Sequence, residues 1–244
     1  MVRVKNPDEI REMIKSHPMN LRRVFSIAAH IDHGKTTTSD YLLRKAGLMS
    51  DADAGKKVMM DSDEEEQERG ITIFTSVVML SYEFEGETYL CEINDTPGHI
   101  SFTGEVSRAL RGSDGVVILV DALEGVMTQT ETNIRLSLAE KCKPVLFINK
   151  VDRLISELRL APQDVFAKID TILAGVNKLI KDNAPKGSAK DWMVSFKDGS
   201  VTVGSAKDGW AFNMSTLQRL QIKPQDIFAK YDEDDKEWLK ENLP

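Results

Sequence analysis

The loop that follows residue 28 carries the clearest chemical pattern in the chain. Positions 29–36 match G-x-x-x-x-G-K-[ST] except at the first place, where Ala29 stands for glycine. In such a loop, backbone N–H groups point at nucleotide phosphates, the lysine reaches the β- and γ-phosphate oxygens, and the last hydroxyl ligates Mg²⁺. Alanine at the first place predicts a negative φ there. We expect nucleotide contacts from Ala29, His30, Ile31, Asp32, His33, Gly34, Lys35, Thr36 and Thr37.

A second motif, Asp-Thr-Pro-Gly-His at 95–99, follows a strand-like apolar segment. Ligands gather at the C-terminal ends of strands in open α/β sheets, so Asp95 is well placed to hold Mg²⁺ through water. Gly98 can offer its N–H to a γ-phosphate because no side chain blocks the approach. A ring nitrogen of His99 can orient the attacking water, which makes His99 the candidate catalytic residue.

The polar stretch 47–72 is long for a connection inside a compact domain, and such loops are usually functional or mobile. Thr72 at its end can add a hydroxyl to Mg²⁺ only while the γ-phosphate is present, as in a switch. The two histidines of the phosphate loop, without a cysteine or a third ligand, make a thin case for zinc, and we expect them to face away from metal. The predicted magnesium ligands are Thr36, Thr72 and Asp95.

A third motif, Asn-Lys-Val-Asp at 149–152, follows another apolar strand. The carboxylate of Asp152 can accept hydrogen bonds from N1–H and the N2 amino group of guanine, whereas adenine presents an acceptor at N1. A site of this kind discriminates by roughly 10⁴ or more. We expect Asn149 to support the loop and contact the base, and the Lys150 stem to cover one ring face. The alternative is that Asp152 simply caps a helix.

Three small residues, Gly204, Ser205 and Ala206, follow a short strand. They would let backbone N–H groups approach the guanine carbonyl. An ordinary tight turn is the alternative interpretation, and the sequence alone leaves both open.

Several elements must bring these motifs together. Continuous apolar runs at 24–28, 115–120 and 144–148 predict strands covered by helices on both faces. A hairpin at 71–93 predicts one antiparallel edge pair. Helices are predicted at 37–45, 102–110 and 130–141. Strand and helix alternate, so the predicted fold is α/β, with a mostly parallel sheet and helices on both faces.

The outer parts of the chain are less regular. We predict an N-terminal helical extension at 1–20, a nucleotide-binding domain at 21–182 and 200–212, and an insert or C-terminal helical appendage at 183–199 and 213–244. A long helix should begin at Pro162. The Asp-Gly pair at 198–199 predicts a hairpin between 192–196 and 201–203.

Composition limits the class of protein. The 244 residues are 41% hydrophobic and 29% charged, which is ordinary globular composition. The net charge of −7 weighs against nucleic-acid binding over the whole surface. No signal or membrane-spanning segment is evident, so we expect a cytoplasmic protein without a membrane partner. Cys91 and Cys142 lie in apolar patterns and should be small buried residues in a reducing compartment.

Taken together, the motifs at 29–36, 69–72, 95–99, 149–152 and 204–206 resemble those of the translational GTPases, a branch of the P-loop NTPases. The Trp-Ala-Phe sequence at 210–212 strengthens the resemblance to the elongation factor 2 family of archaea and eukaryotes. The resemblance implies a ribosomal translocase that converts GTP to GDP and phosphate with Mg²⁺. Ribosomal RNA and stalk proteins would act as activators, and no DNA would be bound. It also implies a monovalent cation near Asp32, and further domains that this chain lacks, so we expect a fragment.

Two alternatives stay open. One is another translational GTPase that delivers tRNA or acts in initiation. The other is a non-catalytic module whose GTP and GDP states select partners.

Overall fold

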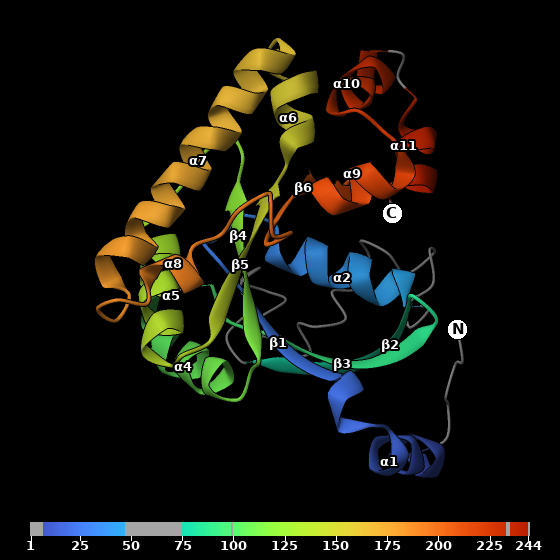
Figure 1. The fold of residues 1–244 in the computed structure, drawn as a ribbon, viewed down its shortest axis with the longest axis vertical. Coiled ribbons are helices and arrows are strands. Elements are labelled where there is room, and N and C mark those ends of the chain that lie inside the picture. Colours follow the sequence, from blue (N-terminus) through green and yellow to red (C-terminus); the bar gives the residue numbers. More distant parts are fainter. Residues whose placement is uncertain (1–6, 47–74, 99, 233–234, 244) are drawn as a thin grey trace.

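The computed structural model describes residues 7–46, 75–98, 100–232 and 235–243. Within these ranges the strands form one seven-stranded sheet in the order β2-β3-β1-β4-β5-β6-β7 (Figure 1). The five inner strands are parallel, and β2 and β7 run antiparallel at the two edges. The strands are β1 Arg22–Ala29, β2 Ser76–Phe84, β3 Glu87–Asp95, β4 Gly115–Asp121, β5 Lys143–Asn149, β6 Val201–Ser205 and β7 Trp210–Phe212.

Helices cover both faces of the sheet. α4, α5 and α7 gather on one side of it and α2 lies on the other, with α9, α10 and α11 beyond β6 (Figure 1). The α-helices are α1 Pro7–Ser16, α2 Lys35–Lys45, α4 Thr103–Arg111, α5 Thr128–Ala139, α6 Val151–Ser156, α7 Pro162–Asn183, α8 Ala189–Trp192, α9 Met214–Leu220, α10 Pro224–Asp232 and α11 Lys236–Asn242. Two 3₁₀ turns, η1 Met19–Leu21 and η2 Ile100–Phe102, precede β1 and α4. The predicted α/β class is confirmed.

The apolar runs of the central strands are buried as expected for parallel strands. Ile118 of β4 and Ile148 of β5 are almost fully buried and share one apolar cluster with Ile134 of α5 and Val176 of α7. The C-terminal helices join the same cluster. Leu217 of α9, Phe228 of α10 and Leu239 of α11 are among the residues that do so.

Two predictions about the edges of the sheet were wrong. The predicted hairpin between 192–196 and 201–203 is absent, because α8 ends at Trp192 and β6 pairs in parallel with β5 instead. Leu146 N–H donates to the carbonyl of Ser200 at 2.9 Å, so the end of this turn is hydrogen-bonded to β5. The second antiparallel edge strand, β7, was not predicted, because three residues are too short for an alternation signal.

Both cysteines are free thiols. Cys142 is buried as predicted, and burial raises its pKa to about 11. Cys91 is only partly buried, contrary to the prediction, because it lies in β3 next to the edge strand β2. Among the described residues, no helix combines the length and apolar character that crossing a membrane requires.

Candidate nucleotide-binding site

The phosphate loop lies between the end of β1 at Ala29 and the start of α2 at Lys35. Ala29 is not among the residues with positive φ, as predicted, whereas Asp32 (φ 61°) and Gly34 (φ 92°) are. A Cβ at Gly34 would lie 2.3 Å from Nδ2 of Asn149. Only glycine therefore fits at this position, where the loop turns into α2.

His33 fastens the loop to the protein interior. Its ring is fully buried, and Nδ1 lies closer to the N–H of Asp121 (3.2 Å) than to the carbonyl of Leu119 (3.4 Å). Nδ1 therefore accepts a hydrogen bond, and Nε2 carries the proton and faces Glu124 Oε2 at 3.2 Å. Burial lowers the pKa of His33. The ring of His33 therefore packs inward, between the loop and the end of β4.

Two side-chain amides of α5 hold the other side of the loop. Gln129 Oε1 accepts the N–H of Ile31 at 3.0 Å, and Asn133 Nδ2 donates to the carbonyl of Ala29 at 3.4 Å. The sequence analysis did not identify either residue. Their spacing of four, on the buried face of a helix, was the available signal.

Lys35 and Asp95 meet at the centre of the site. The parallel register of β1 and β3 places Asp95 opposite Ile27, beside the loop. Lys35 Nζ lies 2.8 Å from Asp95 Oδ1, and both side chains are buried. Thr36, in the first turn of α2, is half-buried, and Thr37 is exposed.

The segment after Asp95 lies against the phosphate loop. The N–H and hydroxyl of Thr96 both donate to the carbonyl of Ile27, at 3.3 and 2.7 Å. A Cβ at Gly98 would lie 3.7 Å from the carbonyl of Ala29 and 3.8 Å from the N of Ile31, which are ordinary contacts. Among the residues that the structure describes, packing therefore leaves room for a side chain at Gly98, and its contact with a γ-phosphate stays a prediction. The predictions on Thr72 and His99 lie outside the described residues.

Asn149 joins the phosphate loop to the turn after β6. Its Nδ2 donates to the carbonyl of His33, and its Oδ1 accepts the N–H of Ala206, both at 3.0 Å. These two hydrogen bonds link the loop to the turn, and the contact of Asn149 with the base stays a prediction. A base carbonyl would have to share or replace Asn149 as the acceptor for Ala206 N–H.

Lys150 makes a second link. It adopts a left-handed conformation (φ 60°) at the start of α6, and its ammonium donates to the carbonyl of Asp32. It also pairs with Asp121 Oδ2 at 2.9 Å. Asp121 is fully buried at the end of β4 and accepts Leu123 N–H at 2.7 Å. Burial raises the pKa of Asp121, but the hydrogen bonds from Lys150 and Leu123 outweigh it and the net pKa is lowered.

Asp121 was missed by the sequence analysis. Its position directly after the apolar run 115–120, at a strand end beside the predicted loops, was the signal that could have identified it.

Asp152 is not a helix cap, since α6 is capped at Lys150 without a side-chain hydrogen bond. Asp152 is 7% exposed, and its Oδ1 has no hydrogen-bond partner among the residues that the structure describes. Burial raises its pKa, the Ser205 side chain lowers it, and the charge of Asp208 raises it. A buried, unpaired carboxylate oxygen is costly. Two N–H donors from a ligand would relieve this cost.

Gly204 has a packing role within the sheet. A Cβ there would lie 2.4 Å from the carbonyl of Trp210 and 2.8 Å from Cα of Ala211. The glycine therefore allows β7 to pack against β6. Ser205 and Ala206 are both buried in the turn that follows.

Comparison with known proteins agrees with this geometry. The family model described as "Elongation factor Tu GTP binding domain" matches residues 20–227. Elongation factor 2 of Pyrococcus furiosus is 48% identical over 236 residues, which cover 97% of this chain and 32% of the relative. Elongation factor 2 of Thermoplasma volcanium is 51% identical over 207 residues, which cover 85% of this chain and 28% of the relative. The chain thus spans about a third of the length of these curated relatives.

Proposed function

The chain belongs to the family of the elongation factor Tu GTP-binding domain, and on this premise we propose that it binds and hydrolyses GTP as the nucleotide domain of a ribosomal translocase of the elongation factor 2 type. Hydrolysis would yield GDP and phosphate and would be coupled to the movement of tRNA and mRNA in the cytoplasm. The names of the curated relatives support this choice over a tRNA-delivering or initiation factor.

The observation that carries the proposal is the unpaired Oδ1 of the buried Asp152. Guanine offers two N–H groups to a carboxylate, whereas adenine would bring its own N1 lone pair against it. The hydrogen bonds of Asn149 connect this acceptor site to the phosphate loop through His33 and to the Ala206 turn. The base and phosphate sites therefore belong to one framework.

The donor set also fits Mg²⁺. Mg²⁺ prefers oxygen ligands and usually keeps several waters while binding one or two protein oxygens and the substrate phosphates. Thr36 and Asp95 supply a hydroxyl and a carboxylate next to Lys35. The described residues contain no group of three or more histidine, cysteine or acidic side chains that would hold a metal alone. Thr36 and Asp95, with Thr72, would hold the ion, which would neutralise phosphate charge. We also propose a monovalent cation near Asp32, which only the family resemblance supports.

Lys35 and the loop amides would stabilise the charge on the transferring phosphoryl group, and His99 would orient the attacking water. We propose the ribosome, through its RNA and stalk proteins, as the activator. Residues 1–20 would form an extension and 183–199 with 213–244 an appendage. The shared apolar cluster supports docking of that appendage on the nucleotide domain.

Calorimetry with GTP, ATP and XTP tests the base site. We expect the chain to bind GTP about 10⁴-fold more tightly than ATP. Asp152→Asn should lose this preference and favour XTP, because an amide N–H can donate to the C2 carbonyl of xanthine. Asp164→Asn is a matched control, since Asp164 also lies in a first helical turn, that of α7, but is exposed. Equal binding of ATP and GTP would refute the proposal.

Phosphate release with ribosomes tests the catalytic assignment. His99→Ala should lower the ribosome-stimulated rate by about 10²–10⁴ with little change in GTP affinity. Hydrolysis as fast as that of the wild type would remove His99 from the mechanism. No stimulation of the wild type would favour a binding module.

A further inference from the structure

Tyr231 is a buried tyrosine of α10 that none of the predicted motifs includes. Its hydroxyl donates to Asp208 Oδ2 and accepts from Trp210 Nε1, both at 2.7 Å. Its ring meets that of Trp210 edge to face, with centroids 5.8 Å apart. Burial and the carboxylate of Asp208 raise the pKa of Tyr231, so its hydroxyl is protonated and donates at neutral pH.

Asp208 belongs to the turn that follows β6. Its N–H donates to Ser205 Oγ at 3.1 Å, and the N–H of Gly209 donates to the Ser205 carbonyl at 2.8 Å. Lys236 of α11 lies 3.7 Å from Asp208 Oδ2. The C-terminal helices therefore hold this turn from outside through the Asp208 carboxylate.

The opposite side of the turn rests on α2. Tyr41 OH donates to the carbonyl of Gly209 at 2.5 Å, and a Cβ at Gly209 would lie 2.6 Å from the Tyr41 ring. The turn is thus clamped between Tyr41 and Tyr231. Helix α2 also begins at the phosphate loop, so the hydrogen bond of Tyr41 connects the turn to the helix that follows this loop.

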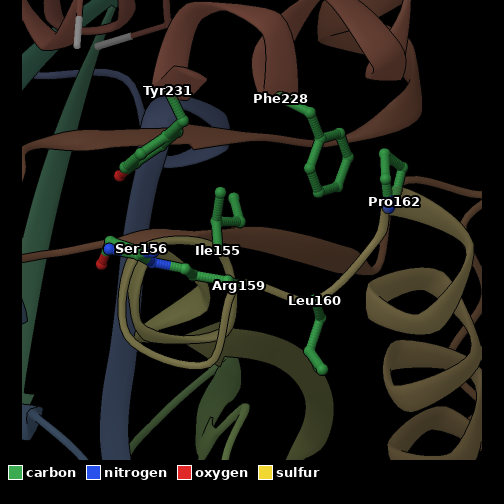
Figure 2. A pocket seen from close by; sticks show the side chains of 7 residues that line it. All are labelled: Ile155, Ser156, Arg159, Leu160, Pro162, Phe228 and Tyr231. Atoms are coloured by element: carbon green, nitrogen blue, oxygen red, sulfur yellow. The ribbon is translucent and has the colours of Figure 1, made fainter.

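Helix α10 also lies against α6, the helix that carries Asp152. These helices border a cavity of about 460 Å³. Figure 2 shows Phe228 and Tyr231 of α10 facing Ile155 of α6 across it, with the Tyr231 hydroxyl pointing away from Phe228. The ring of Tyr231 lines the cavity, whereas its hydroxyl lies outside it and donates to Asp208 in the turn. Helix α10 therefore contacts the Asp208 turn and also borders α6, the helix that carries Asp152.

We propose that Tyr231 is a positioning residue that sets recognition of the guanine C6 carbonyl, by fixing through Asp208 the turn that carries Ser205 and Ala206. The inference rests on the proposed function. A turn that is already fixed loses less conformational entropy when the base binds. Without the hydroxyl, the buried Trp210 Nε1 and the Asp208 carboxylate each lose a hydrogen bond at 2.7 Å.

Three nucleotides distinguish the contacts that the protein makes to the two edges of the base. GTP carries both edges, ITP lacks the N2 amino group that faces Asp152, and 6-thio-GTP replaces the C6 carbonyl with a weakly accepting sulfur. Tyr231→Phe should weaken the binding of GTP and the binding of ITP by the same factor, about 3- to 10-fold. It should leave 6-thio-GTP nearly unchanged, so the preference for GTP over 6-thio-GTP shrinks while the preference for GTP over ITP stays.

Further variants check the route through Asp208. Asp208→Ala should reproduce the effect, and the double variant with Tyr231→Phe should add little to either change, since both remove the same link. Asp208→Asn keeps an acceptor oxygen for the tyrosine and should retain most of the preference. Tyr82→Phe is the matched control, because Tyr82 is exposed on β2. If Tyr231→Phe fails to fold, Asp208→Ala carries the test.

The outcomes separate this inference from the proposed function. The inference would be overturned if Tyr231→Phe bound all three nucleotides more weakly by the same factor, or if its preference for GTP over 6-thio-GTP were unchanged. Either result would show that Tyr231 only stabilises the fold. A wild-type chain that binds GTP and ATP equally would overturn the proposed function as well.

Discussion

The ammonium of Lys35 lies 2.8 Å from Oδ1 of Asp95, and the two side chains are 8% and 0% exposed. They arrive from different elements, the start of α2 and the end of β3. Phosphate oxygens would draw the ammonium away from the carboxylate, while Mg²⁺ would replace it as the carboxylate's cation. The pair therefore stands where the charges of Mg²⁺ and GTP are proposed to lie.

Lys35→Met should destabilise the nucleotide-free protein. Removing the cation from a buried pair costs about 3–5 kcal/mol in the free energy of unfolding, which urea denaturation without nucleotide would measure. Combining it with Asp95→Asn should recover part of the loss, because the buried charge is then also removed. Lys178→Met, at an exposed position of α7, serves as the control. A change below about 1 kcal/mol would mean that the pair contributes as little as a surface ion pair.

His33 should make the stability of the phosphate loop depend on pH. Burial lowers its pKa in the folded state below the ordinary 6.5. The unfolded chain therefore binds a proton first as the pH falls, and stability is lost from about pH 6.5 down to the lowered pKa. His33→Asn keeps an acceptor for Asp121 N–H without titrating in this range. It should flatten the dependence measured by urea denaturation between pH 5 and 7.5, although its maximum stability should be lower.

A comparison with His17→Asn isolates this effect, because His17 lies before β1 and outside the loop. That variant should keep the acid dependence of the wild type. Persistence of the same dependence in His33→Asn would contradict the assignment.

The sequence predicted well what depends on short-range chemistry. Apolar runs located the central strands, and the Gly-Lys-Thr sequence at 34–36 located the loop between β1 and α2, because both signals depend on residues that are adjacent in the chain. What it could not predict depends on neighbours distant in the chain. The Asp-Gly pair at 198–199 is typical of a hairpin turn, yet the strand that follows it pairs in parallel with β5. At Gly204 a side chain would collide with Trp210 and Ala211 of β7, and this packing constraint is visible only in the folded sheet.

Arg111 and Glu140 should set part of the acid stability. The guanidinium of Arg111 in α4 makes two hydrogen bonds of 2.9 Å to Glu140, just after α5. These bonds, followed by one from Ser107, lower the pKa of Glu140 from 4.5 to about 2. The stabilisation is complete above pH 4.5 and is lost as the pH falls through about 2. Arg111→Ala should therefore raise the pH midpoint of acid unfolding, followed by circular dichroism. Arg135→Ala, which removes an exposed pair within α5, should shift the midpoint less.

Asp121 should control how firmly Lys150 holds the phosphate loop. The carboxylate is fully buried and 2.9 Å from the Lys150 ammonium, which also donates to the carbonyl of Asp32. Asp121→Asn keeps an oxygen for Leu123 N–H but loses the charge. We expect the free energy of unfolding to fall by about 1.5–3 kcal/mol and GDP release to become about tenfold faster, as measured by fluorescence of a labelled nucleotide.

The preference for GTP over ATP should not change in Asp121→Asn, because Lys150 acts there on the phosphate loop and leaves Asp152 in place. Asp114→Asn is the matched control at the opposite end of β4, where Asp114 Oδ2 accepts Val24 N–H at 2.8 Å and an amide oxygen can do the same. If release is as slow in Asp121→Asn as in Asp114→Asn, the ion pair stabilises only the strand end, and the lysine is held in the loop by its bond to Asp32 alone.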